Sequence, residues 1–348
     1  MDILQEGRTK ITVARMTGLF CLFLLIAWGL GYPALNRYDP RQTPGLNDVK
    51  TYAAIVNGTA TLDAGYLRFR VLVPWVARPV YQLAKGRVGS WDPVMFGLLV
   101  VDSLFLAATA LLIIVLGTKV LGTRQLDSYA VSLVAALLYL VNFAVPNLRL
   151  AGLVDAGEGF FLLALLWSLS ELEFWALPLV AALGALTKES FVPFSIVFTA
   201  SWWLVVRKKV DSPARSATWI VGNWVVSFVA MIGLQRWIAG RWVSPIEFAT
   251  ELHGNHEYLR RFVSSLSDRT FWYIFLWLLP IGIPNLRRFP KSWLVPIGAA
   301  SAMVFILDAY HGGPPGGVAR ALFSVAGPVL ALSSASLLVG DRDSAPVS

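Results

Sequence analysis

The charged residues that could take part in chemistry stand mostly at the edges of long apolar runs. The first set lies in residues 45–52, where Asp48 and Tyr52 are four positions apart and would share one face of a helix. A carboxylate there could act as a general base toward a hydroxyl group. A structural role is also open, because Asn47 or Asp48 could cap a helix that continues to Val56.

Two arginines, Arg68 and Arg70, alternate with aromatic and apolar residues in the segment 66–75, which reads YLRFRVLVPW. The planar guanidinium fork of arginine matches the oxygens of a phosphate group. The same side chains could instead keep their charge among lipid headgroups while their stems lie on apolar surface. Either interpretation favours a position against lipid for this segment.

Three further charged motifs border apolar runs. Asp155 and Glu158 open one run, and acidic residues at membrane depth tend to face a protein or water cavity because exposing them to lipid is costly. Lys188 and Glu189 lie in a tight connection between two runs, where they could form an ion pair or place an ammonium group beside a phosphate. Arg320 follows a Gly/Pro-rich stretch, which requires a loop and lets backbone approach a ligand.

The elements that must position these residues are predicted to be membrane-spanning helices. Of the 348 residues, 56% are hydrophobic and 14% are charged, whereas ordinary soluble domains carry roughly 25% charged residues. Backbone groups in lipid must be hydrogen-bonded within the chain, so helices are expected for the apolar runs. We predict about ten spans, at residues 13–32, 94–116, 129–145, 157–169, 174–186, 191–206, 219–238, 271–283, 294–307 and 322–339.

The predicted fold is an all-α, polytopic transmembrane bundle that forms one domain, 1–340, followed by a polar C-terminal tail, 341–348. Compact basic clusters occur in short loops, at Lys119 and Arg124, in residues 207–215 and in residues 287–291. The positive-inside rule places these loops and the N-terminus in the cytoplasm. The candidate chemistry, together with a long first loop at 33–93, then falls on the extracytoplasmic side.

Charge and cysteine content exclude other classes. In a chain this apolar, the net charge of +8 indicates loops that face anionic headgroups or an anionic substrate, rather than a nucleic-acid partner. The single cysteine, Cys21, lies inside the first apolar run, so one chain forms no disulfide and no Cys-rich metal site. No cofactor is expected, and a requirement for a divalent metal stays open.

Taken in order, these residues resemble the pattern of the GT-C superfamily of integral-membrane glycosyltransferases, which use lipid-linked sugars. The similarity extends over almost the whole chain. It consists of a first span followed by a long outer loop with an early acid, the segment YLRFRVLVPW, Asp155 opening a span, Thr187-Lys188-Glu189 after an apolar helix, and Arg320 before a last span that contains Pro328. The paired acids that some members have in the first loop are missing from residues 33–93.

The resemblance implies a GT-C-like bundle in the inner (cytoplasmic) membrane, with juxtamembrane helices in the first extracytoplasmic loop. It implies a polyprenyl-phosphate sugar as donor and a hydroxyl of an extracytoplasmic glycan or lipid as acceptor. Asp48 would take the proton of that hydroxyl. The implied substrate-binding residues are Tyr52, Arg68, Arg70, Asp155, Lys188, Glu189 and Arg320, of which the basic ones would stabilise the departing lipid phosphate.

Two other functions are compatible with the sequence. A secondary transporter needs charged groups near the middle of the bilayer, and Asp102, well inside the second span, is the strong candidate for such a group. A non-catalytic membrane subunit with a transferase-like fold is the second alternative, since fold does not determine function. The absence of paired acids in the first loop favours this second alternative.

Overall fold

The computed structural model describes residues 13–37, 47–59, 65–122, 125–143, 153–242, 258–311 and 317–338. Every regular element within these ranges is a helix, as the composition predicts. Most of the Gly/Pro-rich stretch before Arg320 and the predicted polar tail, 341–348, lie outside the described residues.

Each predicted apolar run overlaps a helix of the described chain. These helices are α1 (Val13–Gly31), α5 (Pro93–Val120), α6 (Gln125–Phe143), α7 (Asp155–Ser170), α8 (Ala176–Thr187), α9 (Phe191–Val206), α10 (Pro213–Ala239), α13 (Arg269–Asn285), α14 (Lys291–His311) and α15 (Gly317–Ala335). Shorter elements connect them, namely α2 (Pro33–Arg37), α3 (Asn47–Asn57), η1 (Gly65–Phe69), α4 (Leu72–Ala84), α12 (Tyr258–Leu266), η3 (Leu286–Arg288) and η4 (Ser336–Leu338).

Five of these helical segments are long and apolar enough to cross a membrane, which indicates a membrane-associated protein. They are Val13–Asn36, Pro93–Val120, Pro213–Ala239, Lys291–Ala309 and Gly317–Leu338. Other predicted spans are short helices. The 12 residues of α8, for example, give a length of about 18 Å, whereas the hydrocarbon core is about 30 Å thick.

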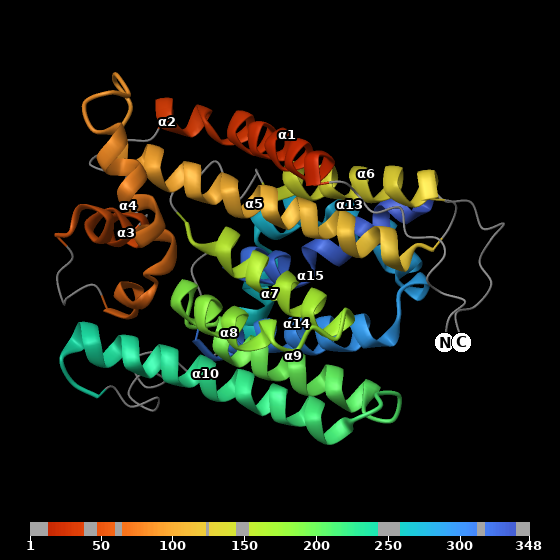
Figure 1. Ribbon diagram of the computed structural model, residues 1–348. Helices are drawn as coiled ribbons and strands as arrows, with labels where there is room; N and C mark the ends of the chain where they lie inside the picture. Colours follow the sequence, from red (N-terminus) through yellow and green to blue (C-terminus); the bar gives the residue numbers. More distant parts are fainter. Residues whose placement is uncertain are drawn as a thin grey trace.

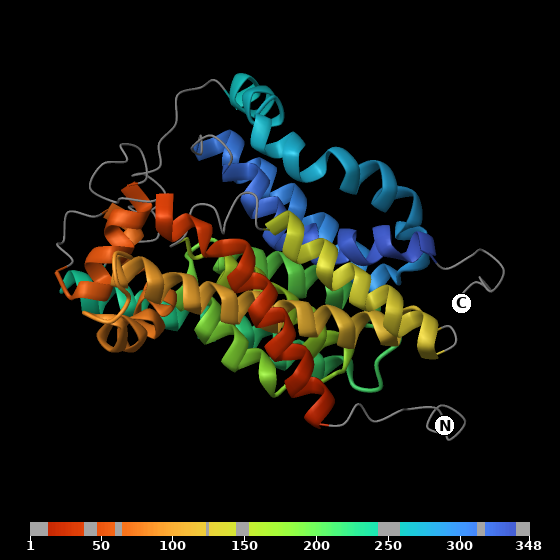
Figure 2. The same cartoon turned by 90° about the horizontal axis from the view of Figure 1, so that it is seen from above.

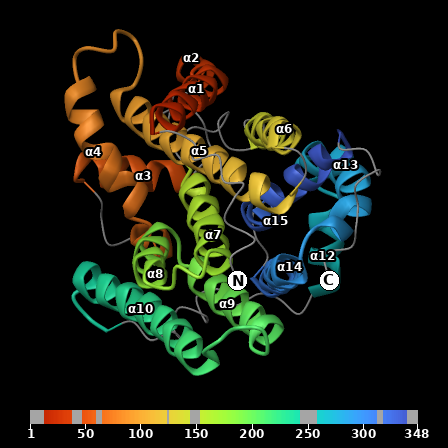
Figure 3. The same cartoon turned by 45° about the vertical axis from the view of Figure 1, so that its right-hand side comes forward.

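Helices α7 and α15 form the interior of the bundle, and the remaining long helices surround them (Figures 1 and 3). Nearly all side chains of α15 and most of those of α7 are buried. Tyr139 of α6 stacks on Phe323 of α15 with ring centroids 5.2 Å apart. The two helices that carry Asp155 and Arg320 are therefore held rigidly by packing on several sides.

The direction of the helices follows from contacts at both of their ends. Helices α5 and α7 are parallel, because Phe105 contacts Phe160 with ring centroids 5.7 Å apart, and Lys119 pairs with Glu171 at 2.8 Å near both C-termini. The connection after α5 therefore lies at the opposite end of the bundle from Asp155, the first residue of α7.

Helices α13 and α15 are also parallel. The rings of Phe275 and Phe323 lie 6.2 Å apart in the N-terminal halves. Toward the C-termini, the Ser333 hydroxyl donates a hydrogen bond of 2.6 Å to the carbonyl oxygen of Gly282. The connection between α13 and α14, which carries Arg287, therefore lies at the end of the bundle opposite Arg320.

We call the end that carries the N-termini of α7 and α15 the site end, and the opposite end the basic end. Figure 2 shows α3 and α4 gathered beyond one end of the long helices. The basic end holds Lys119, Arg207, Lys208, Lys209, Arg215, Arg287, Arg288 and Lys291. The separation of candidate residues from basic loops is thus present in the fold, and which end faces the cytoplasm stays a prediction.

Close packing of α5 on α4 requires a glycine, and this leads to a first testable prediction. A Cβ atom at Gly97 would lie 2.9 Å from the carbonyl oxygen of Ala77 and 3.2 Å from the amide nitrogen of Tyr81. Gly97→Ala should lower the free energy of unfolding by about 1–3 kcal/mol, because the backbone of α4 must move. Thermal unfolding of the purified protein in detergent measures this loss.

The matched control is Gly222→Ala in the middle of α10, where no atom lies within 4 Å of the added Cβ. Alanine is favoured over glycine inside a helix by up to about 1 kcal/mol. Gly222→Ala should therefore leave the unfolding temperature unchanged or raise it. Equal effects of the two substitutions would show that the contact between α4 and α5 does not limit stability.

Candidate functional site

Five segments of the chain bring charged side chains together at the site end. They are α3, the junction between η1 and α4, the start of α7, the connection between α8 and α9, and the start of α15. Figure 1 shows that α3 and α4 lie beside the ends of α7 and α8. Four of the five segments are helix starts or helix connections, where side chains can leave the bundle axis.

Arg70 is the centre of the first half of this cluster. Its guanidinium group holds Glu189 in a two-point ion pair, with Nε donating to Oε2 at 2.7 Å and Nη2 donating to Oε1. Its Nη1 donates to the Tyr52 hydroxyl at 3.0 Å and lies 3.8 Å from Oδ2 of Asp48. The predicted shared face of Asp48 and Tyr52 is thus found, with both side chains directed at Arg70.

Lys188 is the centre of the second half. Its ammonium group donates to Oδ1 of Asp155 at 2.7 Å and to Oε2 of Glu158 at 2.8 Å. The Ser190 hydroxyl donates to the other oxygen of Glu158. Asp155 also accepts a bond of 3.3 Å from Nη1 of Arg320. We call these residues, with Asp48, Tyr52, Arg70 and Glu189, the ion network.

The short connection after α8 joins the two halves. Lys188 has extended backbone angles, φ −161° and ψ 138°, right after the last helical residue. Glu189 begins the turn that leads into α9. From this connection Lys188 reaches Asp155 and Glu158 on α7, while Glu189 reaches Arg70. The amide of Val71 donates to the carbonyl oxygen of Leu186 at 3.0 Å, which ties the start of α4 to the end of α8.

Gly157 of α7 lets the helices α4, α7 and α8 approach each other closely. A Cβ atom at Gly157 would lie 2.9 Å from Cγ2 of Thr187 and 3.2 Å from Cγ2 of Val73. Any larger residue would separate α7 from the end of α8 and from α4. Because Gly157 lies between Asp155 and Glu158, this close approach brings both carboxylates within reach of Lys188.

Burial distinguishes one member of the ion network from the others. The exposed fraction of the side chain is 31% for Asp48, whereas it is at most 16% for Arg70, Lys188, Arg320 and the other carboxylates. Within the network four carboxylates (Asp48, Asp155, Glu158 and Glu189) face three cations (Arg70, Lys188 and Arg320). Asp48 is therefore the carboxylate that a molecule arriving from outside can reach.

The surroundings of Lys188 and Glu189 favour their charged forms. Burial alone would raise the pKa of Glu189, but the adjacent Arg70 outweighs it and holds that pKa below its usual value. Burial alone would lower the pKa of Lys188, but Asp155 and Glu158 outweigh it and hold that pKa above its usual value. Burial raises the pKa of the Tyr52 hydroxyl, in spite of Arg70, so the hydroxyl keeps its proton.

The structure brings together all the predicted site residues except Arg68. Asp48, Tyr52, Arg70, Asp155, Lys188, Glu189 and Arg320 belong to the ion network. Arg68 is placed differently, since its guanidinium carbon lies 4.8 Å from the centroid of the Phe69 ring. The alternation of Arg68 and Arg70 in the sequence did not distinguish these two environments.

Two residues join the network beyond the predicted set. Glu158 is completely buried and pairs with Lys188, and Ser190 donates to Glu158. The spacing of Asp155 and Glu158, three residues apart on one helix face, is a signal for Glu158. Ser190 had a weaker signal, its position directly after Lys188-Glu189. Within the described residues, no group of three His, Cys, Asp or Glu side chains is arranged to hold a metal ion.

Comparison of the chain with protein-family models, with curated proteins and with solved structures gives no match. The helices and the ion network therefore define the class directly: a helical membrane-associated protein with a buried cluster of acids and bases at one end of its bundle. Any narrower assignment depends on the geometry of that cluster.

Proposed function

We propose that the protein is a membrane glycosyltransferase that moves a sugar from a polyprenyl-phosphate donor to an acceptor hydroxyl at the site end. The observation that carries this proposal is the position of Asp48. It is the most exposed carboxylate of the ion network, and it lies 3.8 Å from a buried arginine that holds a second acid. A carboxylate that incoming molecules can reach, fixed at the edge of a charged cluster, suits a general base.

The proposed step transfers one glycosyl group. The oxygen of the acceptor hydroxyl attacks the anomeric carbon of the sugar, and its proton passes to the carboxylate of Asp48. The bond between the anomeric carbon and the phosphate oxygen breaks, and its electron pair stays on that oxygen. The products are the glycosylated acceptor and the lipid phosphate, and the proton on Asp48 is later released to water.

Arg320 is the best-placed cation for the departing phosphate. In the described part of the chain its guanidinium group has one ion-pair contact, 3.3 Å from Nη1 to Asp155, which leaves Nε and Nη2 to bind another anion. Arginine donors aimed at the oxygen that gains charge stabilise the transition state. Arg320 also opens α15, so its position is fixed by the most buried helix of the bundle.

Arg70 and Lys188 act as positioning residues in this proposal. The guanidinium group of Arg70 already binds Glu189 at two points and Tyr52 at a third. The ammonium group of Lys188 already binds two carboxylates. Neither cation could add a phosphate without weakening a buried pair, which costs several kcal/mol. Their proposed role is to hold Asp48 and Arg320 in place.

The test is transfer of radiolabelled sugar from a panel of polyprenyl-phosphate sugars by the purified protein in lipid, with a panel of acceptors. Asp48→Asn keeps the shape of the side chain but removes the base, so it should lower the transfer rate by about 10²–10⁴-fold. Lys50→Gln changes an exposed charge on the same helix and should leave the rate unchanged. Full activity of Asp48→Asn would exclude Asp48 as the base.

A non-catalytic membrane subunit is the second candidate, and one observation favours it. Every charged side chain of the ion network already has a partner of opposite charge, as is typical of a cluster that only holds helices together. This function predicts no transfer with any donor or acceptor. It also predicts that Asp48→Asn lowers the stability of the protein, because the contact with Arg70 is weakened, whereas Lys50→Gln leaves the stability unchanged.

A further inference from the structure

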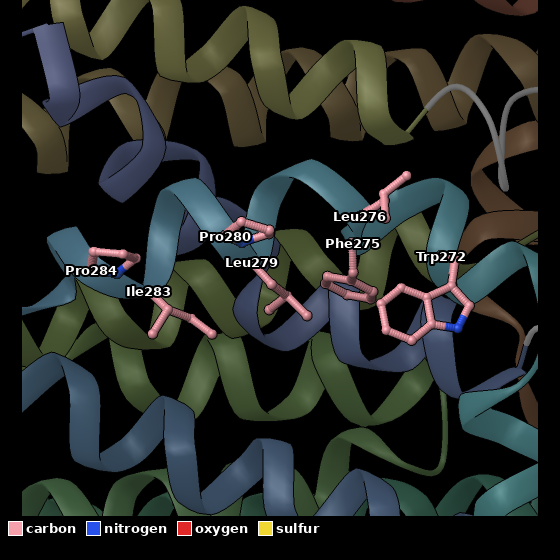
Figure 4. Close-up of a pocket in the computed structure, with 7 residues that line it drawn as sticks. All are labelled: Trp272, Phe275, Leu276, Leu279, Pro280, Ile283 and Pro284. Atoms are coloured by element: carbon pink, nitrogen blue, oxygen red, sulfur yellow. The ribbon is translucent and has the colours of Figure 1, made fainter.

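The outward face of α13 carries a hollow that is separate from the ion network. Its volume is about 320 Å³, and it is lined by apolar side chains, among them Trp272, Leu276, Leu279, Pro280 and Ile283. Figure 4 shows these side chains following one another along a single helix. Trp272, Leu276 and Ile283 are exposed, so the hollow opens outward from the bundle.

Two prolines explain why this face is hollowed. Pro280 and Pro284 both lie inside α13. A proline within a helix removes one backbone hydrogen bond, and its ring displaces the preceding turn, so the helix bends there. Pro280 and Pro284 both line the hollow, so the bend that they are expected to cause falls within it.

A cation stands at the N-terminal end of the same face. Arg269, the first residue of α13, is exposed. The intervals from Arg269 to Trp272, Leu276 and Ile283 are three, seven and fourteen residues, which place all four on one side of a helix. Within the described residues Arg269 forms no ion pair, so its charge is available to a ligand.

The groove runs beside a helix that is long and apolar enough to cross a membrane. Helix α13 runs parallel to α15, with Phe275 against Phe323 and Gly282 bonded to Ser333. The segment that contains α15, Gly317–Leu338, is long and apolar enough to cross a membrane. From Arg269 to the end of the groove α13 rises about 21 Å, against a hydrocarbon core of about 30 Å.

We propose that this face of α13 binds one anionic membrane lipid. The phosphate pairs with Arg269, the Trp272 ring lies at the level of the headgroups, where tryptophan is favoured, and one hydrocarbon chain fills the hollow from Leu276 to Ile283. The fully apolar lining fits a chain, and the exposed guanidinium group of Arg269 fits a phosphate. This lipid site requires no transferase activity and uses no residue of the ion network.

Photolabelling tests the site. The protein is reconstituted in phosphatidylcholine vesicles with a phosphatidylglycerol that carries a diazirine in its acyl chain, and labelled peptides are identified by mass spectrometry. We expect the label to concentrate on α13. Leu276→Trp fills the groove and should reduce that labelling about tenfold. Val225→Trp, on the outward face of α10 where Val225 is also exposed, is the matched control and should leave it unchanged.

The headgroup contact has its own readout. A diacylglycerol probe with the same diazirine chain lacks the phosphate, so it should label α13 of the wild-type protein less than the phosphatidylglycerol probe does. Arg269→Gln should abolish that difference, whereas Lys291→Gln, which removes an exposed cation at the basic end, should preserve it.

Three results would overturn the proposal. One is equal labelling of α10 and α13, which is expected of lipid that merely surrounds the protein. Another is unchanged labelling of α13 in Leu276→Trp. The third is crosslinking of α13 to a second copy of the chain in place of the lipid. If Leu276→Trp does not fold, Ile283→Trp takes its place: it fills the far end of the groove and should likewise reduce the labelling of α13.

Discussion

Replacing Lys188 by alanine is expected to lower the free energy of unfolding by about 3–5 kcal/mol, the cost of removing one partner of a buried ion pair. Lys188 is the shared partner of Asp155 and Glu158, whose side chains are 5% and 0% exposed. Without its ammonium group two carboxylates would lie side by side in the interior with less compensating charge. Denaturant unfolding in a detergent micelle measures the loss.

The matched control is Lys119→Ala, which removes the cation of an exposed pair. Lys119 and Glu171 have side chains that are 44% and 24% exposed, and such pairs contribute up to about 1 kcal/mol. Adding Glu158→Gln to Lys188→Ala should restore part of the stability, because one unpaired charge is then removed. If Lys188→Ala costs no more than Lys119→Ala, Lys188 does not hold the site end together.

Replacing Arg70 is expected to have the second large effect. Arg70→Met should lower the free energy of unfolding by about 3–5 kcal/mol, because Glu189 would remain buried without its partner. Arg70→Lys should cost about 1.5–3 kcal/mol, the value of a hydrogen bond to a charged group. Lysine keeps the charge, but it has no planar fork for Glu189 and cannot reach Tyr52 at the same time.

A double-mutant cycle separates the pair from its surroundings. Arg70→Met, Glu189→Gln and the double variant are unfolded under the same conditions, and a coupling of about 0.5–3 kcal/mol is expected for groups in direct contact. Arg215→Met, which removes an exposed arginine at the basic end, serves as the control for the loss of an arginine. A coupling near zero would contradict the two-point ion pair between Arg70 and Glu189.

Much of the local structure could be predicted from the sequence. The run 191–206 is a helix with those bounds, and every other predicted run overlaps a helix, because apolar backbone must satisfy its hydrogen bonds internally. The shared face of Asp48 and Tyr52 follows from helical spacing alone. The number of membrane crossings did not follow from the apolar runs: about ten spans were predicted, and five segments within the described residues are long and apolar enough to span.

The pairing of the charged residues could not be predicted, because it joins distant parts of the chain. Arg70 and Glu189 are 119 positions apart, and Arg320 and Asp155 are 165 apart. Sequence periodicity reports which residues share a face of one helix, but it contains no information on which helices meet. Both ion pairs depend on how α4, α7, α8 and α15 pack against one another.

Residue types and their spacing were thus enough to predict a helical, membrane-associated chain with candidate residues at the ends of its apolar runs. The environments of these residues became known from the packing of the helices. Lys188 lies between two carboxylates, Arg68 lies over the ring of Phe69, and the Asp48 carboxylate is the most exposed one of the ion network. The physical reason is that residue type and spacing define what a side chain can do, whereas burial and partners, which depend on packing, define what remains available for a ligand.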